Sequence, residues 1–343
     1  MREDFQIIRR HLGRLKNSET PVRDLFQGGL KALSFLYRAP DGYLFRRFSV
    51  ANSPTRSSAD TTYFYKLNKR IRNAFDLPFS LNFSKIEIEL TTACNLKCNN
   101  CDRSCGQAPS TEHMSLDQLR KFIDESVKHG KKWRKIIIQG GEPLIHPNIH
   151  EALQLFVDYK NQHSPGTFLR ITTNGYGTRV KKVLESLPRE INVMNTGKIP
   201  LDDNGHVQIT GRPETEFDTY HIATVDSIDA SKNAAIDYSK GCHILETGGL
   251  GLTRYGYYPC GAGASVDRVF GFNVGAKSLE EMRSPAFRAS LQKLCRHCGH
   301  FKAKGRYDLK DAAPLTSPDQ ATSESWRVAF TQYKENQAKL SDY

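Results

Sequence analysis

The chain has 343 residues, which is enough for about two domains, each with its own hydrophobic core. Hydrophobic residues make up 38% and charged residues 25% of the sequence, which excludes a collagen-like or intrinsically disordered chain. No run approaches the roughly 18 apolar residues of a membrane-spanning helix, and the charged N-terminus lacks the apolar core of a secretory signal. We therefore expect a cytoplasmic protein, whose eight cysteines favour metal binding or catalysis over disulfides.

The net charge of +12 is concentrated at the N-terminal end. Residues 1–84 carry 15 basic and 7 acidic side chains, a net +8, and we expect them to form a basic N-terminal extension. An amphipathic helix is predicted at its start, because Phe5, Ile8 and Leu12 recur at helical spacing among arginines. The excess charge favours an anionic partner: nucleic acid, a phosphorylated substrate, an acidic peptide or a membrane surface. For the basic helix itself, we expect a solvated face docked on the main domain, with a membrane-surface or nucleic-acid role as the alternative.

From residue 85 onward, strand and helix patterns alternate. Strands are predicted at 85–90, 135–139, 167–173, 191–194, 206–210 and 221–225. Helices are predicted from a capping box of Ser115 and Gln118, over 150–160 and over 179–187. This alternation predicts an α/β fold in which βαβ units form a parallel sheet or barrel.

A cysteine-rich loop follows the first predicted strand. Cys94, Cys98 and Cys101 have the spacing Cys-x3-Cys-x2-Cys, and three soft thiolates from one short loop select an iron–sulfur cluster or zinc. Three ligands on a four-iron cluster leave one iron open, as catalysis requires. The alternative is a structural zinc loop with Cys105 or His113 as the fourth ligand.

Three motifs in order resemble the radical S-adenosylmethionine (radical SAM) superfamily. The cysteine loop resembles its cluster loop, Gly140-Gly141-Glu142-Pro143 its GGEP motif, and Thr172-Thr173-Asn174-Gly175 its TNG turn. Each motif follows a predicted strand, at the end of a barrel where active sites are built. The resemblance covers about residues 85–300 and implies a partial (β/α)6 TIM-type barrel over residues 85–235.

The resemblance also implies the cofactors. The open iron of a [4Fe-4S] cluster on Cys94, Cys98 and Cys101 would chelate S-adenosylmethionine, which reductive cleavage converts to a 5′-deoxyadenosyl radical. Cofactor-binding residues would be Gly140, Gly141, Glu142, Pro143, Thr173 and Asn174. Paired glycines allow close approach of the methionyl part, and Glu142 would accept hydrogen bonds from its ammonium. The chain departs from the family in having Asn100 where an aromatic residue is frequent, and no glycine-rich adenine motif is visible over 191–225.

A second set of cysteines lies in the C-terminal third of the chain. Cys242, Cys260, Cys295 and Cys298 surround a predicted hairpin with a turn at 254–256 and a helix-like segment at 278–294. This order resembles the twitch and SPASM extensions of radical SAM enzymes. It implies a small cysteine-rich β-hairpin and helix domain over 236–305, holding one auxiliary [4Fe-4S] cluster, with 306–343 as a tail. The alternative is a zinc site with four thiolates.

The motifs do not encode the substrate. We expect an oxidoreductase that removes hydrogen from a sugar- or aminocyclitol-like small molecule, because a single auxiliary cluster resembles the layout of the radical dehydrogenase of aminoglycoside biosynthesis. A flavodoxin- or ferredoxin-type reductant is implied. Cys105 is a candidate hydrogen donor, which would make the enzyme an epimerase, or it is a spare buried thiol. A peptide maturase, an RNA-modifying enzyme and a non-enzymatic zinc protein remain alternatives.

Overall fold

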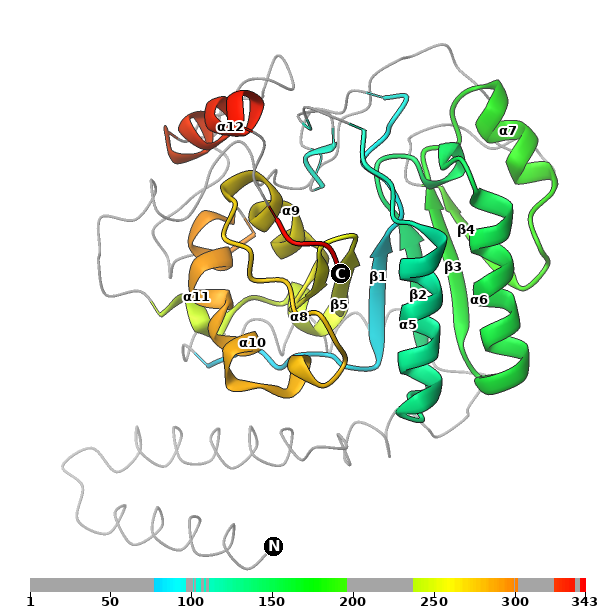
Figure 1. Ribbon diagram of the computed structural model, residues 1–343, viewed down its shortest axis with the longest axis horizontal. Helices are drawn as coiled ribbons and strands as arrows, with labels where there is room; N and C mark the ends of the chain where they lie inside the picture. Colours follow the sequence, from blue (N-terminus) through cyan, green and yellow to red (C-terminus); the bar gives the residue numbers. More distant parts are fainter. Residues whose placement is uncertain are drawn as a thin grey trace, which may run out of the picture. The chain divides into compact units, whose positions relative to one another are not determined.

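A six-stranded sheet is the framework of the described part of the chain (Figure 1). The computed structural model describes residues 77–96, 101, 103–105, 108, 111–195, 237–298, 300–301, 324–336 and 340–343. The strands lie in the order β4-β3-β2-β1-β5-β6. Their bounds are Lys85–Glu89 (β1), Lys135–Gln139 (β2), Phe168–Thr173 (β3), Ile191–Asn195 (β4), Leu250–Thr253 (β5) and Gly256–Tyr258 (β6).

The sheet is mainly parallel, which confirms the α/β fold. Strands β1 to β5 pair in parallel, and only β6 runs antiparallel to its neighbour β5. Among the described strands the sheet is open, as a partial barrel is. The strands that we predicted at 206–210 and 221–225 lie outside the described residues.

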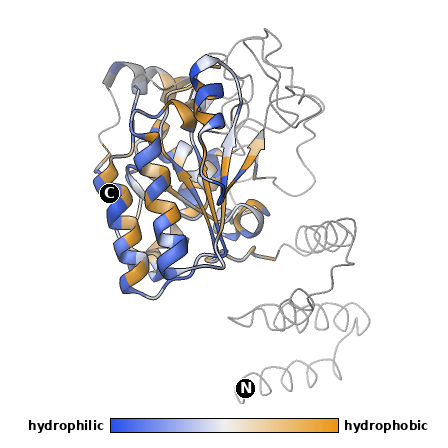
Figure 2. Ribbon diagram, turned by 90° about the vertical axis from the view of Figure 1, so that its right-hand side faces the viewer, coloured by the Kyte–Doolittle hydropathy of each residue, from blue (hydrophilic) through white to orange (hydrophobic). Residues whose placement is uncertain are grey.

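Helices follow the first three strands and cover one face of the sheet. They are α5 (Leu116–Lys128), α6 (Ile149–His163) and α7 (Thr178–Glu185). The predicted capping box is confirmed: Gln118 N–H donates to the Ser115 hydroxyl, and Ser115 N–H donates to the Gln118 side chain. Each helix has a hydrophilic and a hydrophobic side (Figure 2).

The core on this face comes from alternate residues of the strands. Ile86, Ile136 and Leu169 occupy paired positions in β1, β2 and β3, and all three are fully buried. They belong to one hydrophobic cluster with Phe122 of α5 and Phe156 of α6. Since side chains alternate across a sheet, the intervening residues of these strands face the opposite side.

The predicted hairpin extends this sheet. Strand β5 pairs with β1, with Ile86 opposite Leu250 and Ile88 opposite Leu252. The domain boundary that we expected between residues 235 and 236 lies at the edge of a segment outside the described residues and stays a prediction. Helix α9 (Gly261–Phe270) follows β6 and packs against the face of the sheet opposite α5 and α6. The approach is close, since a Cβ on Gly251 of β5 would lie only 2.9 Å from Gly261 Cα.

Short helices and one longer helix complete the C-terminal region. They are η3 (Tyr238–Lys240), α8 (Ile244–Thr247), η4 (Glu281–Arg283), α10 (Pro285–Ala289), α11 (Leu291–Leu294), η5 (Cys295–His297) and α12 (Glu324–Asn336). The 3-10 turn η2 (Pro143–Ile145) follows β2. The prediction of one helix-like segment over 278–294 is wrong in detail. Ser284 is extended and caps α10, and Pro285 begins that helix because proline fits the first helical turn.

A second core fills the side of the sheet that carries α9. Val266 and Val269 of α9 join Trp326 and Phe330 of α12 in it, and Trp326 donates its indole N–H to the His297 carbonyl at 2.7 Å.

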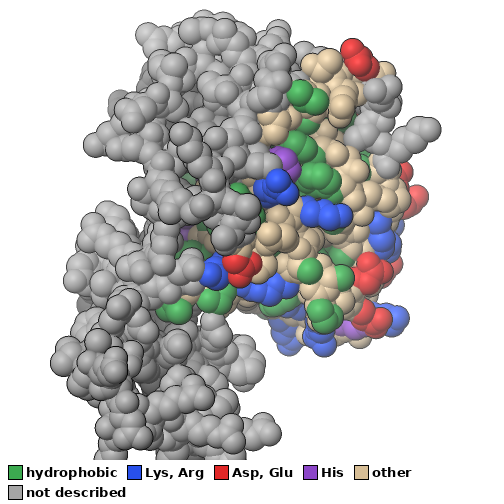
Figure 3. All heavy atoms as spheres, turned by 90° about the vertical axis from the view of Figure 1, so that its left-hand side faces the viewer, with side chains coloured by type: hydrophobic (Ala, Val, Ile, Leu, Met, Phe, Trp, Pro, Cys, Tyr) green, Lys and Arg blue, Asp and Glu red, His purple; other side chains and the backbone are tan. Residues whose placement is uncertain are grey.

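None of the described helices is both long and apolar enough to cross a membrane. On the face shown in Figure 3, the described surface carries basic and acidic side chains next to each other. The basic and acidic residues of the 1–84 segment all lie outside the described residues.

Candidate active site

Three loops leave the sheet at neighbouring strand ends (Figure 1). Because β1, β2 and β3 are adjacent and parallel, their C-terminal ends meet at one edge. Cys94 follows β1, residues 140–143 follow β2, and residues 173–175 close β3. The described parts of the three motifs therefore come together, as their order along the chain predicted.

The two glycines of the GGEP turn lie directly against the cysteine loop. A Cβ on Gly140 would lie 2.4 Å from the Thr91 carbonyl oxygen, and one on Gly141 would lie 2.2 Å from the Ala93 carbonyl oxygen. This close approach allows Gly141 N–H to donate to Thr91 O, and Glu142 N–H to Ala93 O, both at 2.7 Å. Both glycines thus lie against the backbone of the cysteine loop, and their predicted contact with a cofactor stays a prediction.

Glu142 joins the GGEP turn to the TNG turn. Its carboxylate is fully buried, and Oε1 accepts from Leu144 N–H at 3.0 Å and from the Thr173 hydroxyl at 2.8 Å. Oε2 accepts from Asn174 N–H at 2.7 Å. Burial raises the pKa of Glu142 to about 7, against the opposing effect of these hydrogen bonds. The contact with a cofactor ammonium stays a prediction, since the contacts of this carboxylate are with the protein's own donors.

Asn174 connects the TNG turn to the cysteine loop. Its amide N–H donates to Asn95 Oδ1 at 2.9 Å, and its Nδ2 lies 3.9 Å from Cys94 Sγ. In return, the Asn95 amide donates to the Tyr176 carbonyl, and Tyr176 N–H donates to Asn174 Oδ1 at 2.8 Å. Asn95 was missed in the sequence, although an amide side chain directly after a predicted ligand cysteine was a usable signal. The pair holds Cys94 in place at the end of β1.

The remaining residues of the cysteine loop are described in part. Cys98 and Asn100 lie outside the described residues. Cys105 is buried, and its thiol donates to the Arg103 carbonyl at 3.7 Å. A hydrogen bond with the Cys101 side chain and then burial raise the pKa of Cys105. The structure therefore holds Cys105 as a protonated thiol beside a predicted ligand.

His113, the other fourth ligand considered for a zinc loop, lies beside Thr91, the second residue after β1. Its Nδ1 forms a hydrogen bond of 2.9 Å with the Thr91 hydroxyl, and burial lowers the pKa of the imidazole. Its ring meets that of His146 edge to face, with centroids 5.2 Å apart. Most of the 191–225 segment, in which we found no adenine motif, lies outside the described residues.

The second set of cysteines comes together around one cavity. Cys242, Cys260, Cys295 and Cys298 all line it, and its other walls are largely apolar, formed by Ile244, Leu245, Ala262, Gly263, Leu294, His300 and Phe301. Burial raises the pKa of Cys260 to about 11 and raises the pKa values of Cys295 and Cys298. Among the described residues, no three His, Cys, Asp or Glu side chains form a group that could hold a metal ion.

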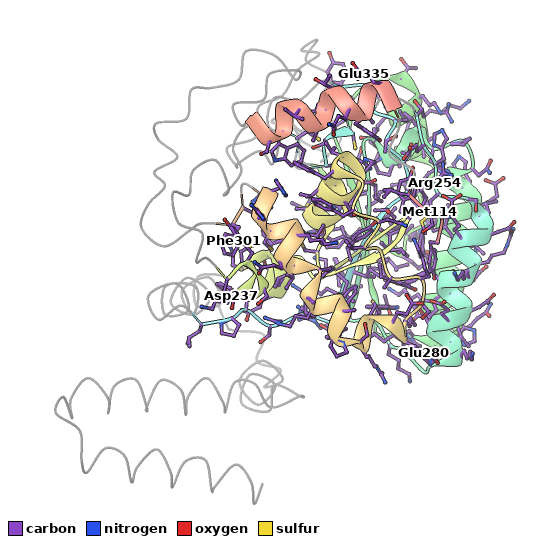
Figure 4. The ribbon with its side chains drawn as sticks, turned by 60° about the vertical axis from the view of Figure 1, so that its left-hand side comes forward. Met114, Asp237, Arg254, Glu280, Phe301 and Glu335 are labelled. Atoms are coloured by element: carbon purple, nitrogen blue, oxygen red, sulfur yellow. The ribbon has the colours of Figure 1, made fainter. Side chains whose placement is uncertain are left out.

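The walls of this cavity come from segments far apart in the sequence. Cys242 precedes α8, and Cys260 is the N-cap of α9, where its sulfur accepts from Gly263 N–H at 3.3 Å. Phe301 packs against Tyr238 with ring centroids 4.9 Å apart, and Figure 4 shows Phe301 and Asp237 on the same side of the C-terminal region. The thiols thus surround a space rather than lie along one loop.

The face of the sheet opposite α5 and α6 carries polar side chains near the strand ends. Glu89 of β1 lies opposite Gln139 of β2, and Arg170 and Thr172 of β3 belong to the same face by alternation. Within the described part of the chain, each of the four has a buried polar atom without a hydrogen-bond partner: Glu89 Oε2, Gln139 Nε2, Arg170 Nε and Thr172 Oγ1. Such atoms are costly to leave unpaired, so they indicate a place for a polar ligand.

Comparisons with known proteins agree with the motifs. Residues 88–213 match the family model described as the Radical SAM superfamily. The chain is 29% identical over 119 residues to GTP 3′,8-cyclase from Aliarcobacter butzleri, across 34% of this chain and 35% of that protein. It is 31% identical over 121 residues to a protein of Methanocaldococcus jannaschii named as a glycyl-radical enzyme activating enzyme, across 35% and 42%. The chain therefore spans well under half the length of these relatives.

Solved structures match as well. One of them is the crystal structure of BtrN in complex with AdoMet and 2-DOIA, at 18% identity and a TM-score of 0.40. The alignment covers 70% of this chain and 99% of that chain.

Proposed function

The chain belongs to the radical SAM superfamily, and from this premise we propose that it is an oxidoreductase that removes hydrogen from a polar small molecule. The family implies a [4Fe-4S] cluster and S-adenosylmethionine. Cys94, Cys98 and Cys101 would hold the cluster, and the GGEP and TNG turns would position the nucleotide beside it. When bound, the reduced cluster and S-adenosylmethionine supply a radical able to take a hydrogen atom from an unactivated carbon.

The cavity shared by the four C-terminal thiols carries the assignment to an oxidation. Thiolates around a single zinc ion converge to about 2.3 Å from one point, whereas thiolates around a four-iron cluster enclose a volume. Cys242, Cys260, Cys295 and Cys298 line one cavity, and their place after the three radical SAM motifs in the chain supports the cluster over zinc. An auxiliary cluster there would supply a one-electron acceptor, which oxidation of a carbon–hydrogen bond requires after hydrogen atom loss.

The polar side chains on the sheet face opposite α5 and α6 support a polar small molecule as the substrate. The four buried polar atoms belong to a carboxylate, an amide, a guanidinium and a hydroxyl group, on Glu89, Gln139, Arg170 and Thr172. Together they include hydrogen-bond donors and acceptors and both a positive and a negative charge. A molecule with several hydroxyl or amino groups matches such a surface, and an apolar substrate would leave its polar atoms unpaired. We infer a sugar- or aminocyclitol-like substrate, with electrons delivered by a flavodoxin- or ferredoxin-type protein.

Anaerobic reconstitution and product analysis test this function. We expect about eight irons per chain, from two four-iron clusters, and formation of 5′-deoxyadenosine from S-adenosylmethionine after reduction. Cys94→Ala should abolish 5′-deoxyadenosine formation. Cys260→Ala should lower the iron content to about four and retain 5′-deoxyadenosine formation. With a panel of aminocyclitols and amino sugars, the wild type should give a product about two mass units lighter, and Cys260→Ala should not.

Other outcomes would contradict the proposal in distinguishable ways. One or two zinc ions and no iron would identify a zinc protein. Solvent deuterium at an inverted carbon, with no change of mass in ordinary water and with loss of this product in Cys105→Ala, would identify an epimerase. Binding of RNA or of an acidic peptide that is lost on deletion of residues 1–84 would replace the small-molecule substrate class.

A further inference from the structure

A buried ion pair connects the two sets of cysteines. Arg103 lies two residues after Cys101, and its Nη2 is 2.5 Å from Glu87 Oε2 on β1. The two side chains are 9% and 14% exposed, so water screens their charges little. Arg103 belongs to the loop that bears Cys101, and Glu87 lies on β1, an inner strand of the sheet.

The same pair lies against the residue that follows Cys260. A Cβ on Gly261 would lie 2.0 Å from Arg103 Nη1 and 2.5 Å from Glu87 Oε2, so both charged groups pack directly on the Gly261 backbone. Gly261 is the first residue of α9, and Cys260 is the N-cap of this helix. Both a positive and a negative charge therefore lie within one residue of an auxiliary ligand.

A second pair fixes the first. Arg268 of α9 contacts Glu89, which is two residues after Glu87 on the same face of β1, and donates to the carbonyl of Arg103. Arg268 and Glu89 are 3% and 4% exposed. Strand β1 therefore contacts both the loop that bears Cys101 and helix α9, which begins after Cys260. These contacts keep Arg103 against the Gly261 backbone.

We propose that Arg103 and Glu87 are positioning residues that set the reduction potential of the auxiliary cluster on Cys242, Cys260, Cys295 and Cys298. The inference rests on the proposed function. Reduction adds one negative charge to a cluster, and a nearby guanidinium stabilises that charge, while a nearby carboxylate destabilises it. Removing each partner should consequently move the potential in opposite directions, which loss of packing alone would not do.

The experiment isolates the auxiliary cluster in the full chain. In a background with alanine at residues 94, 98 and 101, only the auxiliary cluster contributes to the electron paramagnetic resonance signal. An anaerobic redox titration of that signal should give a more negative midpoint potential for Arg103→Gln and a more positive one for Glu87→Gln. Arg103→Lys keeps the charge and should stay near the parent potential. The matched control is Arg120→Gln, which removes an exposed ion pair with Asp117 and should leave the potential unchanged.

A double variant covers the case in which a single variant does not fold. Arg103→Gln combined with Glu87→Gln buries no unpaired charge and should titrate between the two single variants, near the parent. Shifts of the same sign in both single variants, or shifts no larger than that of the control, would overturn the inference and leave the proposed function intact. Absence of iron and of any cluster signal in the background would instead overturn the proposed auxiliary cluster, and this inference with it.

Discussion

Glu142 shows how one buried side chain determines the geometry between two motifs. Its carboxylate accepts three hydrogen bonds from the turns after β2 and β3, and burial raises its pKa from 4.5 to about 7. The folded state therefore binds this proton more tightly than the unfolded state. Stability from this group is full below about pH 4.5 and falls as the pH rises to about 7. We expect the free energy of unfolding of wild type to lose on the order of 2–3 kcal/mol across this window, relative to Glu142→Gln.

Urea unfolding of both proteins at several pH values between 5 and 8 measures this difference. Asp117→Asn is the control, because Asp117 is an exposed carboxylate and should show no such relative slope. A wild type that gains stability relative to Glu142→Gln between pH 5 and pH 7 would show that the three hydrogen bonds outweigh burial. The side chain would then be ionised throughout this range.

The turn after β2 depends on backbone contacts that only glycine permits. At Gly141, an added Cβ would meet the carbonyl oxygens of Ala93 at 2.2 Å and of Thr92 at 2.8 Å, and neither atom belongs to a flexible side chain. Gly141→Ala should therefore separate the turn from the cysteine loop and break the hydrogen bond from Glu142 N–H to Ala93 O. We expect a loss of about 1–3 kcal/mol in stability and a large loss of 5′-deoxyadenosine formation.

Gly166→Ala is the matched control for this turn. Gly166 precedes β3, and a Cβ there would have no neighbour within 4 Å. Its substitution should leave activity unchanged and alter stability by less than about 1 kcal/mol, because it acts chiefly through the unfolded chain. Thermal midpoints and 5′-deoxyadenosine assays of the two variants would contradict the close-approach argument if both variants behaved alike.

Residues 340–343 link helix α5 to the β5–β6 hairpin. The hydroxyls of Tyr343 and Tyr257 each lie 3.0 Å from Glu125 Oε2 on α5, so a C-terminal residue and a β6 residue bind the same carboxylate. Asp342 accepts two hydrogen bonds of 3.0 Å from Arg254 in the β5–β6 turn. In Figure 1 this segment runs beside β5 and α5. It thus links the hairpin to the helix that follows β1.

Deletion of residues 340–343 should weaken this link. We expect the free energy of unfolding to fall by about 2–4 kcal/mol, since a buried aromatic ring and several hydrogen bonds are lost, and by about 1 kcal/mol for Tyr343→Phe. Hydrogen exchange should speed up in both α5 and the β5–β6 hairpin after the deletion. Faster exchange in only one of these elements would show that the segment does not connect them.

The local elements and the order of the motifs were readable in the sequence. The periodicity of 85–90 and 135–139 predicted β1 and β2, and Ser115 with Gln118 predicted the start of α5, because these signals arise from neighbours within one turn or strand. The placement of three motifs after three successive strands also predicted where the described site residues would meet. The resemblance to the radical SAM superfamily also rested on those motifs alone.

Contacts between distant segments were decided only by the tertiary structure. The sequence did not indicate that β5 of the predicted hairpin pairs with β1, more than 160 residues earlier. The residues next to Arg103 in the sequence did not indicate that its side chain would lie against Gly261. The residues next to Glu142 did not indicate that its carboxylate would accept a hydrogen bond from Asn174 N–H. Periodicity and capping report which face of an element is apolar, but pairing between elements depends on packing summed over the whole fold. Spacing along the chain therefore predicted the ligands of each site, and packing determined which charges lie beside them.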